Sequence, residues 1–132
     1  MPGSSVKMIQ KAKTLPADQV FLDLEDAVAA EAKTEARANV AAALVEPGWA
    51  GQLRGVRVND WTTPWTHADV IDVVAGAGAV LDIVVLPKVT HVSHIHALDL
   101  LLGPLEATHD LPVGRIGIEA QIEDAKGLTN ID

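Results

Sequence analysis

Short apolar runs alternate along the chain with longer stretches of helical spacing, and this alternation constrains the fold more than any other feature. We predict that the short runs are buried strands, at residues 20–22, 55–59, 82–87 and 114–122. Roughly 30 residues separate successive runs, which is the spacing of βα units around a parallel sheet. The pattern therefore predicts an α/β fold.

Helical spacing occurs at residues 6–13, 27–45, 66–75 and 92–108, and a further helix is predicted after residue 122. Ser4 or Ser5 can cap the first helix, because a hydroxyl accepts a hydrogen bond from a free amide of the first turn. We expect Gly103-Pro104 to bend or divide the fourth helix. The second predicted helix, at residues 27–45, is rich in alanine. Its Lys33 and Arg37 are flanked by glutamates and are expected on an exposed face.

The composition supports a globular domain and excludes some functions. Of the 132 residues, 48% are hydrophobic and only 3% aromatic, so the core must consist of Ala, Val, Ile and Leu. The net charge of −8 argues against nucleic-acid binding, which needs a basic surface. No cysteine is present to form a disulfide or a thiolate metal site.

No segment of the sequence is typical of membrane insertion. We see no basic segment followed by an apolar stretch at the N-terminus, as a signal peptide would have. The apolar run at residues 75–87 contains Asp82 and is too short to span a bilayer. We therefore expect a cytoplasmic protein without a membrane partner.

Polar side chains stand where the predicted strands end. They are Glu25 and Asp26 after the first strand, Arg57 and Asn59 on the second, Lys88 after the third and Glu123 after the fourth. Because the carboxyl ends of parallel strands meet at one edge of a sheet, we expect these six side chains to gather there. Carboxylates with room for water suit Mg²⁺, and an arginine can hold a substrate carboxylate through two parallel hydrogen bonds.

Each of these residues also has a structural explanation. An acidic residue after a strand often caps the next helix, and Arg57 or Lys88 could form a surface ion pair. Their joint occurrence at successive strand ends is what indicates a site.

Histidines and tryptophans provide weaker candidates. His91 and His94 have the spacing of a helical metal-binding pair, but no carboxylate completes a ligand set within the segment, so we expect a solvated helix start. Trp61 and Trp65 could line a ligand pocket near the second strand, whereas packing is expected for Trp49.

Four motifs occur in order: DLEDAV at 23–28, RVN at 57–59, LPKV at 86–89 and IEDAKGL at 122–128. Together they resemble the HpcH/HpaI aldolase and citrate lyase β-subunit family, and residues 55–65 look closest to its malyl-CoA lyase members. Pro2-Gly3-Ser4 is similar to the end of that family's first strand. The resemblance implies that residues 1–132 form the N-terminal half of a (β/α)₈ TIM barrel, about four to five βα units, with the first strand and the C-terminal half outside the chain.

The resemblance also implies a Mg²⁺ site, with Mn²⁺ as an alternative metal. Glu123 matches the carboxylate that binds the metal directly, and Glu25 with Asp26 matches the acidic pair that holds its water ligands. A second aspartate ligand of the family would lie outside this chain.

For the substrate, Arg57 matches the arginine that grips the carboxylate of a 2-oxo acid. Asn59 is expected to contact substrate or to support Arg57 or the loop. Lys88 is expected at the mouth of the barrel, either in contact with substrate or as structural or electrostatic support. Ser5 departs from the family pattern, since many relatives have a basic residue there.

The function implied is that of a Mg²⁺-dependent carbon–carbon lyase, which cleaves or forms a malyl-CoA- or citramalyl-CoA-like thioester from an acyl-CoA and a 2-oxo acid such as glyoxylate. The family implies a homo-oligomer, a trimer or hexamer, and no residue is an obvious catalytic base. Citrate lyase β-subunit or hydroxy-diacid aldolase activity stays open, as does a non-catalytic half-barrel acting as a binding or assembly module. A flavodoxin-like open sheet is disfavoured, because no glycine-rich turn follows a strand.

Overall fold

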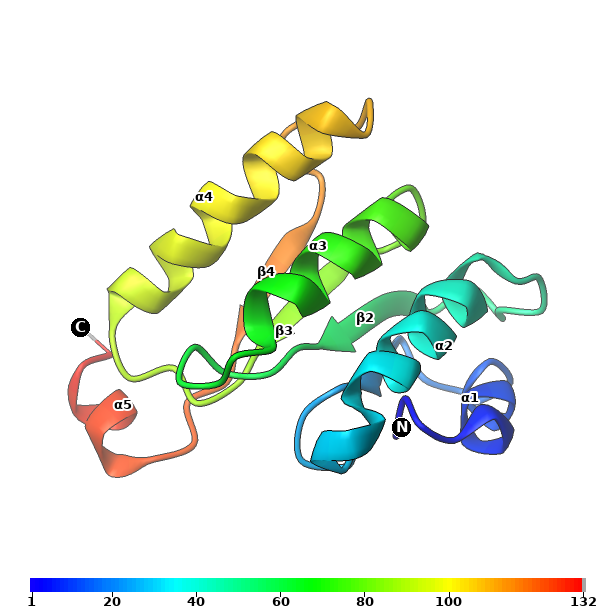
Figure 1. Cartoon of the computed structure of the whole chain (residues 1–132), viewed down its shortest axis with the longest axis horizontal. Helices are drawn as coiled ribbons and strands as arrows, with labels where there is room; N and C mark the ends of the chain where they lie inside the picture. Colours follow the sequence, from blue (N-terminus) through cyan, green and yellow to red (C-terminus); the bar gives the residue numbers. More distant parts are fainter. Residues whose placement is uncertain (132) are drawn as a thin grey trace.

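In the computed structural model, which describes residues 1–131, helices alternate with the strands of one parallel sheet (Figure 1). The elements are α1 (Val6–Ala12), β1 (Gln19–Asp23), the 3-10 turn η1 (Ala30–Ala32), α2 (Lys33–Val45), β2 (Leu53–Arg57), α3 (Thr66–Ala77), β3 (Ile83–Leu86), α4 (Val92–Thr108), β4 (Gly117–Ala120) and α5 (Ala125–Thr129). Within residues 1–131, no helix combines the length and the apolar character needed to cross a membrane.

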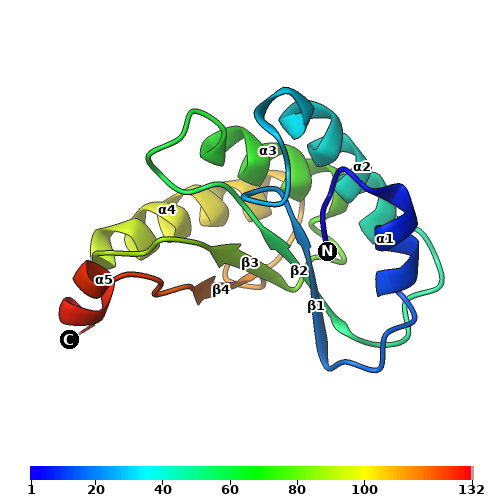
Figure 2. The same cartoon turned by 90° about the horizontal axis from the view of Figure 1, so that it is seen from below.

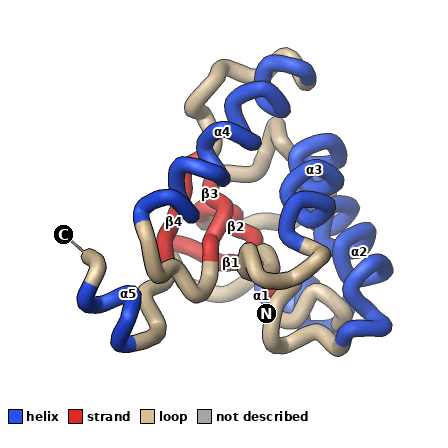
Figure 3. The backbone as a smooth tube through the Cα atoms, turned by 60° about the vertical axis from the view of Figure 1, so that its left-hand side comes forward, coloured by secondary structure: helices blue, strands red, loops and turns tan. Residues whose placement is uncertain are grey.

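The four strands pair in the order β1-β2-β3-β4, and every pairing is parallel. Helices α2, α3 and α4 cover one face of this sheet (Figures 2 and 3). The repeated passage from strand to helix and back to the neighbouring strand is the arrangement of (β/α) barrel units. This confirms the predicted fold class.

The uncovered face of the sheet is concave. Nε2 of Gln19 on β1 donates a hydrogen bond of 2.7 Å to Oε2 of Glu119 on β4, although β2 and β3 lie between them. Three strand spacings in a flat sheet amount to about 14 Å, which two upright side chains would not bridge. The sheet is therefore curled toward the face without helices, as in a partial barrel.

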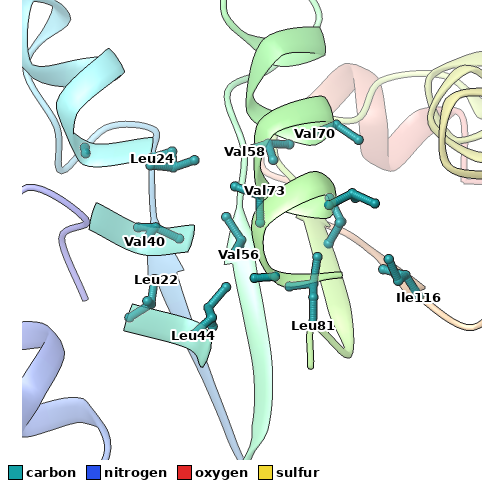
Figure 4. Packing of buried hydrophobic residues seen from close by; sticks show 14 of the residues in the cluster. Leu22, Leu24, Val40, Leu44, Val56, Val58, Val70, Val73, Leu81 and Ile116 are labelled. Carbon is teal, nitrogen blue, oxygen red and sulfur yellow. The ribbon is translucent and has the colours of Figure 1, made fainter. Parts of the chain in front are cut away.

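The core lies between the sheet and its helices. Side chains alternate along each strand, so Leu22 of β1 and Val56 of β2 face the helices. They join Val40 and Leu44 of α2 and Val73 of α3 in a single buried cluster (Figure 4). Small aliphatic residues fill this space, as the low aromatic content predicts.

Residues 1–3 lie beside β1 where a parallel neighbouring strand would pair. The amide of Asp23 donates to the carbonyl of Met1 at 2.7 Å, and the amide of Gly3 donates to the carbonyl of Asp23 at 2.8 Å. A Cβ on Gly3 would come within 2.7 Å of Cγ2 of Val40 and 2.9 Å of the Asp23 carbonyl oxygen, so this approach requires glycine.

The predicted order of elements is confirmed, and so is Ser5 as a cap, since its hydroxyl accepts from the amide of Met8. The predicted division of α4 is wrong, because the helix continues through Pro104. This proline is exposed, so water can reach the carbonyl that loses its amide partner.

Two predictions for the second helix are also wrong. The α-helix begins at Lys33 rather than at residue 27, because the preceding residues form a turn bound to the end of β1. Lys33 and Arg37 are 6% and 8% exposed rather than solvated, because both reach polar partners beneath the helix.

Candidate functional site at the mouth of the sheet

The carboxyl ends of the strands form a common edge, which we call the mouth, and Asp23 organises it. Its buried carboxylate accepts hydrogen bonds from Nε and Nη2 of Arg57, at 2.8 and 2.7 Å. It also accepts from the amides of Glu25 and Ala27, at 2.9 and 3.1 Å. Burial alone would raise the pKa of Asp23, but the hydrogen bonds from Arg57 and the two amides lower it overall.

Arg57 offers one free edge to the mouth. Asp23 occupies the Nε and Nη2 side of the guanidinium, which also lies 5.6 Å from the centre of the Phe21 ring. With the described residues, Nη1 forms no hydrogen bond, and the side chain is 19% exposed. The hydrogen bonds with Asp23 raise the pKa of Arg57, against the effect of burial. The Nη1 and Nη2 edge is therefore free to bind an anion.

Glu25 is a buried carboxylate placed between two cations. Its side chain is 3% exposed, Oε1 lies 2.5 Å from Nζ of Lys88, and Oε2 lies 3.4 Å from Nε of Arg57. These are ion pairs, and within residues 1–131 neither oxygen accepts a hydrogen bond of normal geometry. Glu25 therefore keeps lone pairs for a further donor or a water molecule.

Lys88 connects the acidic residues on both sides of the mouth. Its Nζ lies 3.3 Å from Asp26 and 3.9 Å from Asp60, in addition to Glu25, while its backbone amide donates to Oε1 of Glu123 at 3.0 Å. The close contact with Glu25 raises the pKa of Lys88 far above its ordinary value, so the group stays an ammonium. Its backbone has φ of 53°, an unusual conformation for a residue other than glycine.

The Asn59 side chain is 2% exposed and lies behind the mouth. Its Nδ2 donates to the carbonyl of Leu24 and to Asp69, and its Oδ1 accepts from Lys33. All of its amide hydrogens and its carbonyl are engaged with the protein. This arrangement favours the expected supporting role over contact with a substrate.

A cavity of about 350 Å³ opens beside Lys88. It is lined by Asp60, Trp61, Thr62, Lys88, Thr90, His94, Glu123 and Asp124. The indole Nε1 of Trp61 donates to the carbonyl of His94, which fixes the ring as one wall. A larger cavity of about 620 Å³, between α4, β4 and α5, is lined mainly by apolar side chains and lacks these charged groups.

The histidines at residues 91–96 lie at the start of α4, where the sequence predicts a solvated helix start. His91 caps α4, since its ring nitrogen accepts from the amide of Ser93 at 3.1 Å. His94 contributes instead to the cavity beside Lys88.

The donors at the mouth fit a hard divalent cation in part. Glu123 is exposed, with one oxygen bonded to the Lys88 amide, and Glu25 retains two oxygens without hydrogen bonds. Carboxylate oxygens are the ligands that Mg²⁺ prefers. Over the described part of the chain, however, no three carboxylates or imidazoles come close enough together to hold a metal. The residues present therefore fit part of a Mg²⁺ ligand set.

The sequence identified Glu25, Asp26, Arg57, Lys88 and Glu123, and the structure brings them to one edge. It missed Asp23 and Asp60. Asp23 could have been found from strand parity, since it is two residues beyond Phe21 and so shares the concave face with Arg57, its partner in register.

Comparisons with known proteins place the chain in a family and show the same fold in solved structures. The sequence model of the HpcH/HpaI aldolase/citrate lyase family matches residues 1–132. The chain is 34% identical over 134 residues to L-malyl-CoA/beta-methylmalyl-CoA lyase of Cereibacter sphaeroides, covering 99% of this chain and 41% of that protein. It is 35% identical over 130 residues to a (3S)-malyl-CoA thioesterase of the same species, a match that covers 98% of this chain and 41% of that protein.

Among solved structures, protein CitE of Mycobacterium tuberculosis in complex with magnesium and acetate superimposes with a TM-score of 0.72 at 25% identity. The match covers 99% of this chain and 45% of that one. The chain thus spans less than half the length of the proteins it matches, and its whole sheet has a counterpart in them.

Proposed function

This chain belongs to the HpcH/HpaI aldolase/citrate lyase family, and we propose that it supplies the mouth of a carbon–carbon lyase acting on malyl-CoA-like thioesters. The observation that carries the proposal is the open Nη1 and Nη2 edge of Arg57 beside Glu25, with Glu123 bonded to the backbone amide of Lys88, the residue whose ammonium contacts Glu25. The mouth of the sheet thus holds both an arginine that can bind a carboxylate and carboxylates that can bind a metal. The lyase of Cereibacter sphaeroides supports the choice of thioester.

Arg57 would bind the carboxylate of a 2-oxo acid such as glyoxylate. Its free edge can donate two parallel hydrogen bonds, which fix both the position and the plane of a carboxylate. Asp23 holds the adjacent Nε and Nη2 edge of the guanidinium, so Arg57 needs little rearrangement to bind. The substrate's reacting carbon would thereby be oriented at the mouth.

Glu123 would bind Mg²⁺ directly, while Glu25 and Asp26 would hold its water ligands. The CitE structure in complex with magnesium and acetate supports the choice of Mg²⁺ as the metal, which Mn²⁺ could replace. When bound, the metal supplies a positive charge that polarises the carbonyl and stabilises the oxyanion formed as the carbon–carbon bond is made.

Lys88 has an electrostatic role in this proposal. Because its pKa is raised, it is neither a base nor an amine nucleophile at neutral pH. Its ammonium offsets the negative charge of Glu25 and Asp26, which would otherwise repel an anionic substrate. We assign the catalytic base to no residue of this chain.

The test is a product analysis of the intact protein with malyl-CoA and Mg²⁺. A lyase releases acetyl-CoA and glyoxylate, whereas a thioesterase releases free CoA and malate. The second activity is a real alternative, since the thioesterase relative is as similar as the lyase. We expect glyoxylate and acetyl-CoA in equal amounts, with loss of both on addition of EDTA. Release of malate and CoA would identify a hydrolase, and absence of any product would favour a binding or assembly role.

A further inference from the structure

Helix α2 places a buried lysine directly behind the mouth. Lys33 is its first residue and is 6% exposed. Nζ donates to the carbonyls of Leu24 and Glu25, at 2.7 and 2.6 Å, and to Oδ1 of Asn59 at 2.7 Å. An ammonium has three hydrogens, so these three acceptors use all of its donors.

Two of these acceptors belong to one short segment, residues 23–27, which we call the acidic turn. The acidic turn carries Glu25 and Asp26, and its other end is held by the Asp23 carboxylate through the amides of Glu25 and Ala27. Asp23 therefore binds the amides of the turn while Lys33 binds its carbonyls. Together the two side chains fix the peptide planes on both sides of Glu25.

A second layer of contacts holds Lys33 and Asn59 in place. Asn59 donates to Asp69 at 2.6 Å, and Asp69 accepts from Nε of Arg37 at 3.0 Å. Asp69 is 0% exposed and Arg37 is 8% exposed. The centre of the Trp65 ring lies 5.2 Å from Nζ of Lys33, within the range of a cation–π contact.

Burial lowers the pKa of Lys33, and the nearby carboxylates of Asp69, Asp23, Glu25 and Asp26 oppose that effect. A buried ammonium in a helix that could have carried an apolar residue is costly unless it is fully paired. Here its pairing is directed at the backbone of the acidic turn.

We infer that Lys33 is a positioning residue for the acidic turn, acting through two consecutive backbone carbonyls. The inference rests on the proposed function only in that the acidic turn is taken to serve the metal and the substrate. Without the ammonium, each of the two buried carbonyls would lose one of its two donors, since Leu24 also accepts from Asn59 and Glu25 also accepts from the amide of Val28. The acidic turn would then be held less firmly. The Glu25 carboxylate would then no longer lie between Lys88 and Arg57.

The test uses chemical rescue at an introduced cysteine. Residues 1–132 contain no cysteine, and any cysteine elsewhere in the intact protein is first changed to serine. Lys33→Cys is prepared in the intact protein and treated with 2-bromoethylamine in denaturant, then refolded, which restores an ammonium at nearly the original length. Lys13→Cys, treated in the same way, is the matched control. Lys13 is also buried at 4% exposure and ion-paired with Glu46 at 2.7 Å, but it bonds residues 46–50 away from the mouth.

Two readouts are compared, Mn²⁺ affinity by electron paramagnetic resonance and hydrogen exchange of the amides at residues 24–27. We expect Lys33→Cys to weaken Mn²⁺ binding by about 10-fold, as outer-shell changes commonly do. Its acidic turn should exchange faster than in Lys13→Cys, and aminoethylation should restore both values. Exchange and Mn²⁺ affinity equal to those of the Lys13→Cys control, or no recovery on aminoethylation, would overturn the inference. Hydrogen exchange reports on the positioning role of Lys33 even if the protein proves not to be a lyase. Failure of the Lys33 inference can therefore be distinguished from failure of the proposed function.

Discussion

Asp23 and Arg57 are partners in register on neighbouring strands, and they form a two-point ion pair with distances of 2.7 and 2.8 Å. This pair leaves a single edge of the guanidinium facing the mouth. It also ties the orientation of Arg57 to the acidic turn, because the same carboxylate accepts two amides of that turn. The arginine and the carboxylates for which we propose substrate and metal binding are thereby fixed relative to each other.

Arg57→Lys should weaken binding of the 2-oxo acid more than it affects folding. A lysine retains the charge but cannot bind Asp23 and a substrate carboxylate through two separate planar edges. Loss of one charge-assisted hydrogen bond costs about 1.5–3 kcal/mol, so KM for glyoxylate in the condensation direction should rise about 10-fold to 100-fold. Steady-state kinetics will measure this, with Arg54→Lys as the control, since Arg54 donates to the carbonyl of Leu44. An unchanged KM in Arg57→Lys would remove Arg57 from the substrate site.

Asp23→Asn should make the free energy of unfolding depend less on pH below about pH 4. The folded-state pKa of Asp23 lies below its ordinary value of about 3.9. The carboxylate therefore contributes stability above about pH 4, and this contribution is lost as the pH falls through the lower folded-state pKa. We expect the variant to lose about 2–3 kcal/mol of unfolding free energy at neutral pH, because a charge of a largely buried pair is left alone.

The measurement is urea unfolding between pH 2 and 7. The difference between wild type and Asp23→Asn should shrink as the pH falls below about 4, because the unfolded wild type then binds a proton that the folded protein still resists. Below the folded-state pKa, both states are protonated and the contribution is gone. Asp82→Asn, which changes an acceptor of the Arg54 amide far from Arg57, serves as control. A difference that stays constant over the whole pH range would contradict the ion-pair explanation.

Glu123→Gln should abolish tight Mg²⁺ binding while leaving the fold intact. The amide oxygen can still accept from the Lys88 backbone, but the charge that attracts the cation is gone. Calorimetric titration with Mg²⁺ or Mn²⁺ should show a loss of affinity of at least about 10-fold. Glu119→Gln, which changes a carboxylate on the same sheet away from the mouth, should bind the metal like the wild type. Equal affinity in Glu123→Gln and wild type would refute the ligand assignment.

Glu106→Gln should destabilise the protein without changing its kinetics. The Glu106 carboxylate is 1% exposed and accepts from the amides of Gly114 and Ile116, both at 2.6 Å, just before β4. A glutamine retains one acceptor and turns an NH₂ group toward the other amide, at a cost of about 1–3 kcal/mol. Thermal unfolding should show a lower Tm, and activity assayed well below that temperature should match wild type. A changed KM would indicate that this distant contact does influence the mouth.

Much of the fold was predictable from local pattern. Strands and helices follow from apolar periodicity, and a Ser5 hydroxyl caps the helix that directly follows it. The gathering of Glu25, Arg57, Lys88 and Glu123 was also predictable, because parallel strands bring their carboxyl ends to one edge whatever their detailed packing.

The beginning of α2 could not be read from propensity. The alanine-rich sequence favours helix from residue 27 onward, yet Asp23 draws the amide of Ala27 into a turn. A nearby carboxylate, held in place by its long-range partner Arg57, thus overrides a local preference worth a few tenths of a kcal/mol per residue.

By itself, the sequence determined the order of the elements, the parallel sheet and the edge at which its charged residues meet, because these depend on periodicity and on strand direction. Only the tertiary structure decided that Lys33 is buried and that Gln19 meets Glu119 across the concave face. The partners of Lys33 are largely backbone carbonyls, which every residue possesses, so no sequence pattern marks them. The Gln19–Glu119 contact depends on the curvature of the sheet, which arises only when all four strands and their covering helices pack together.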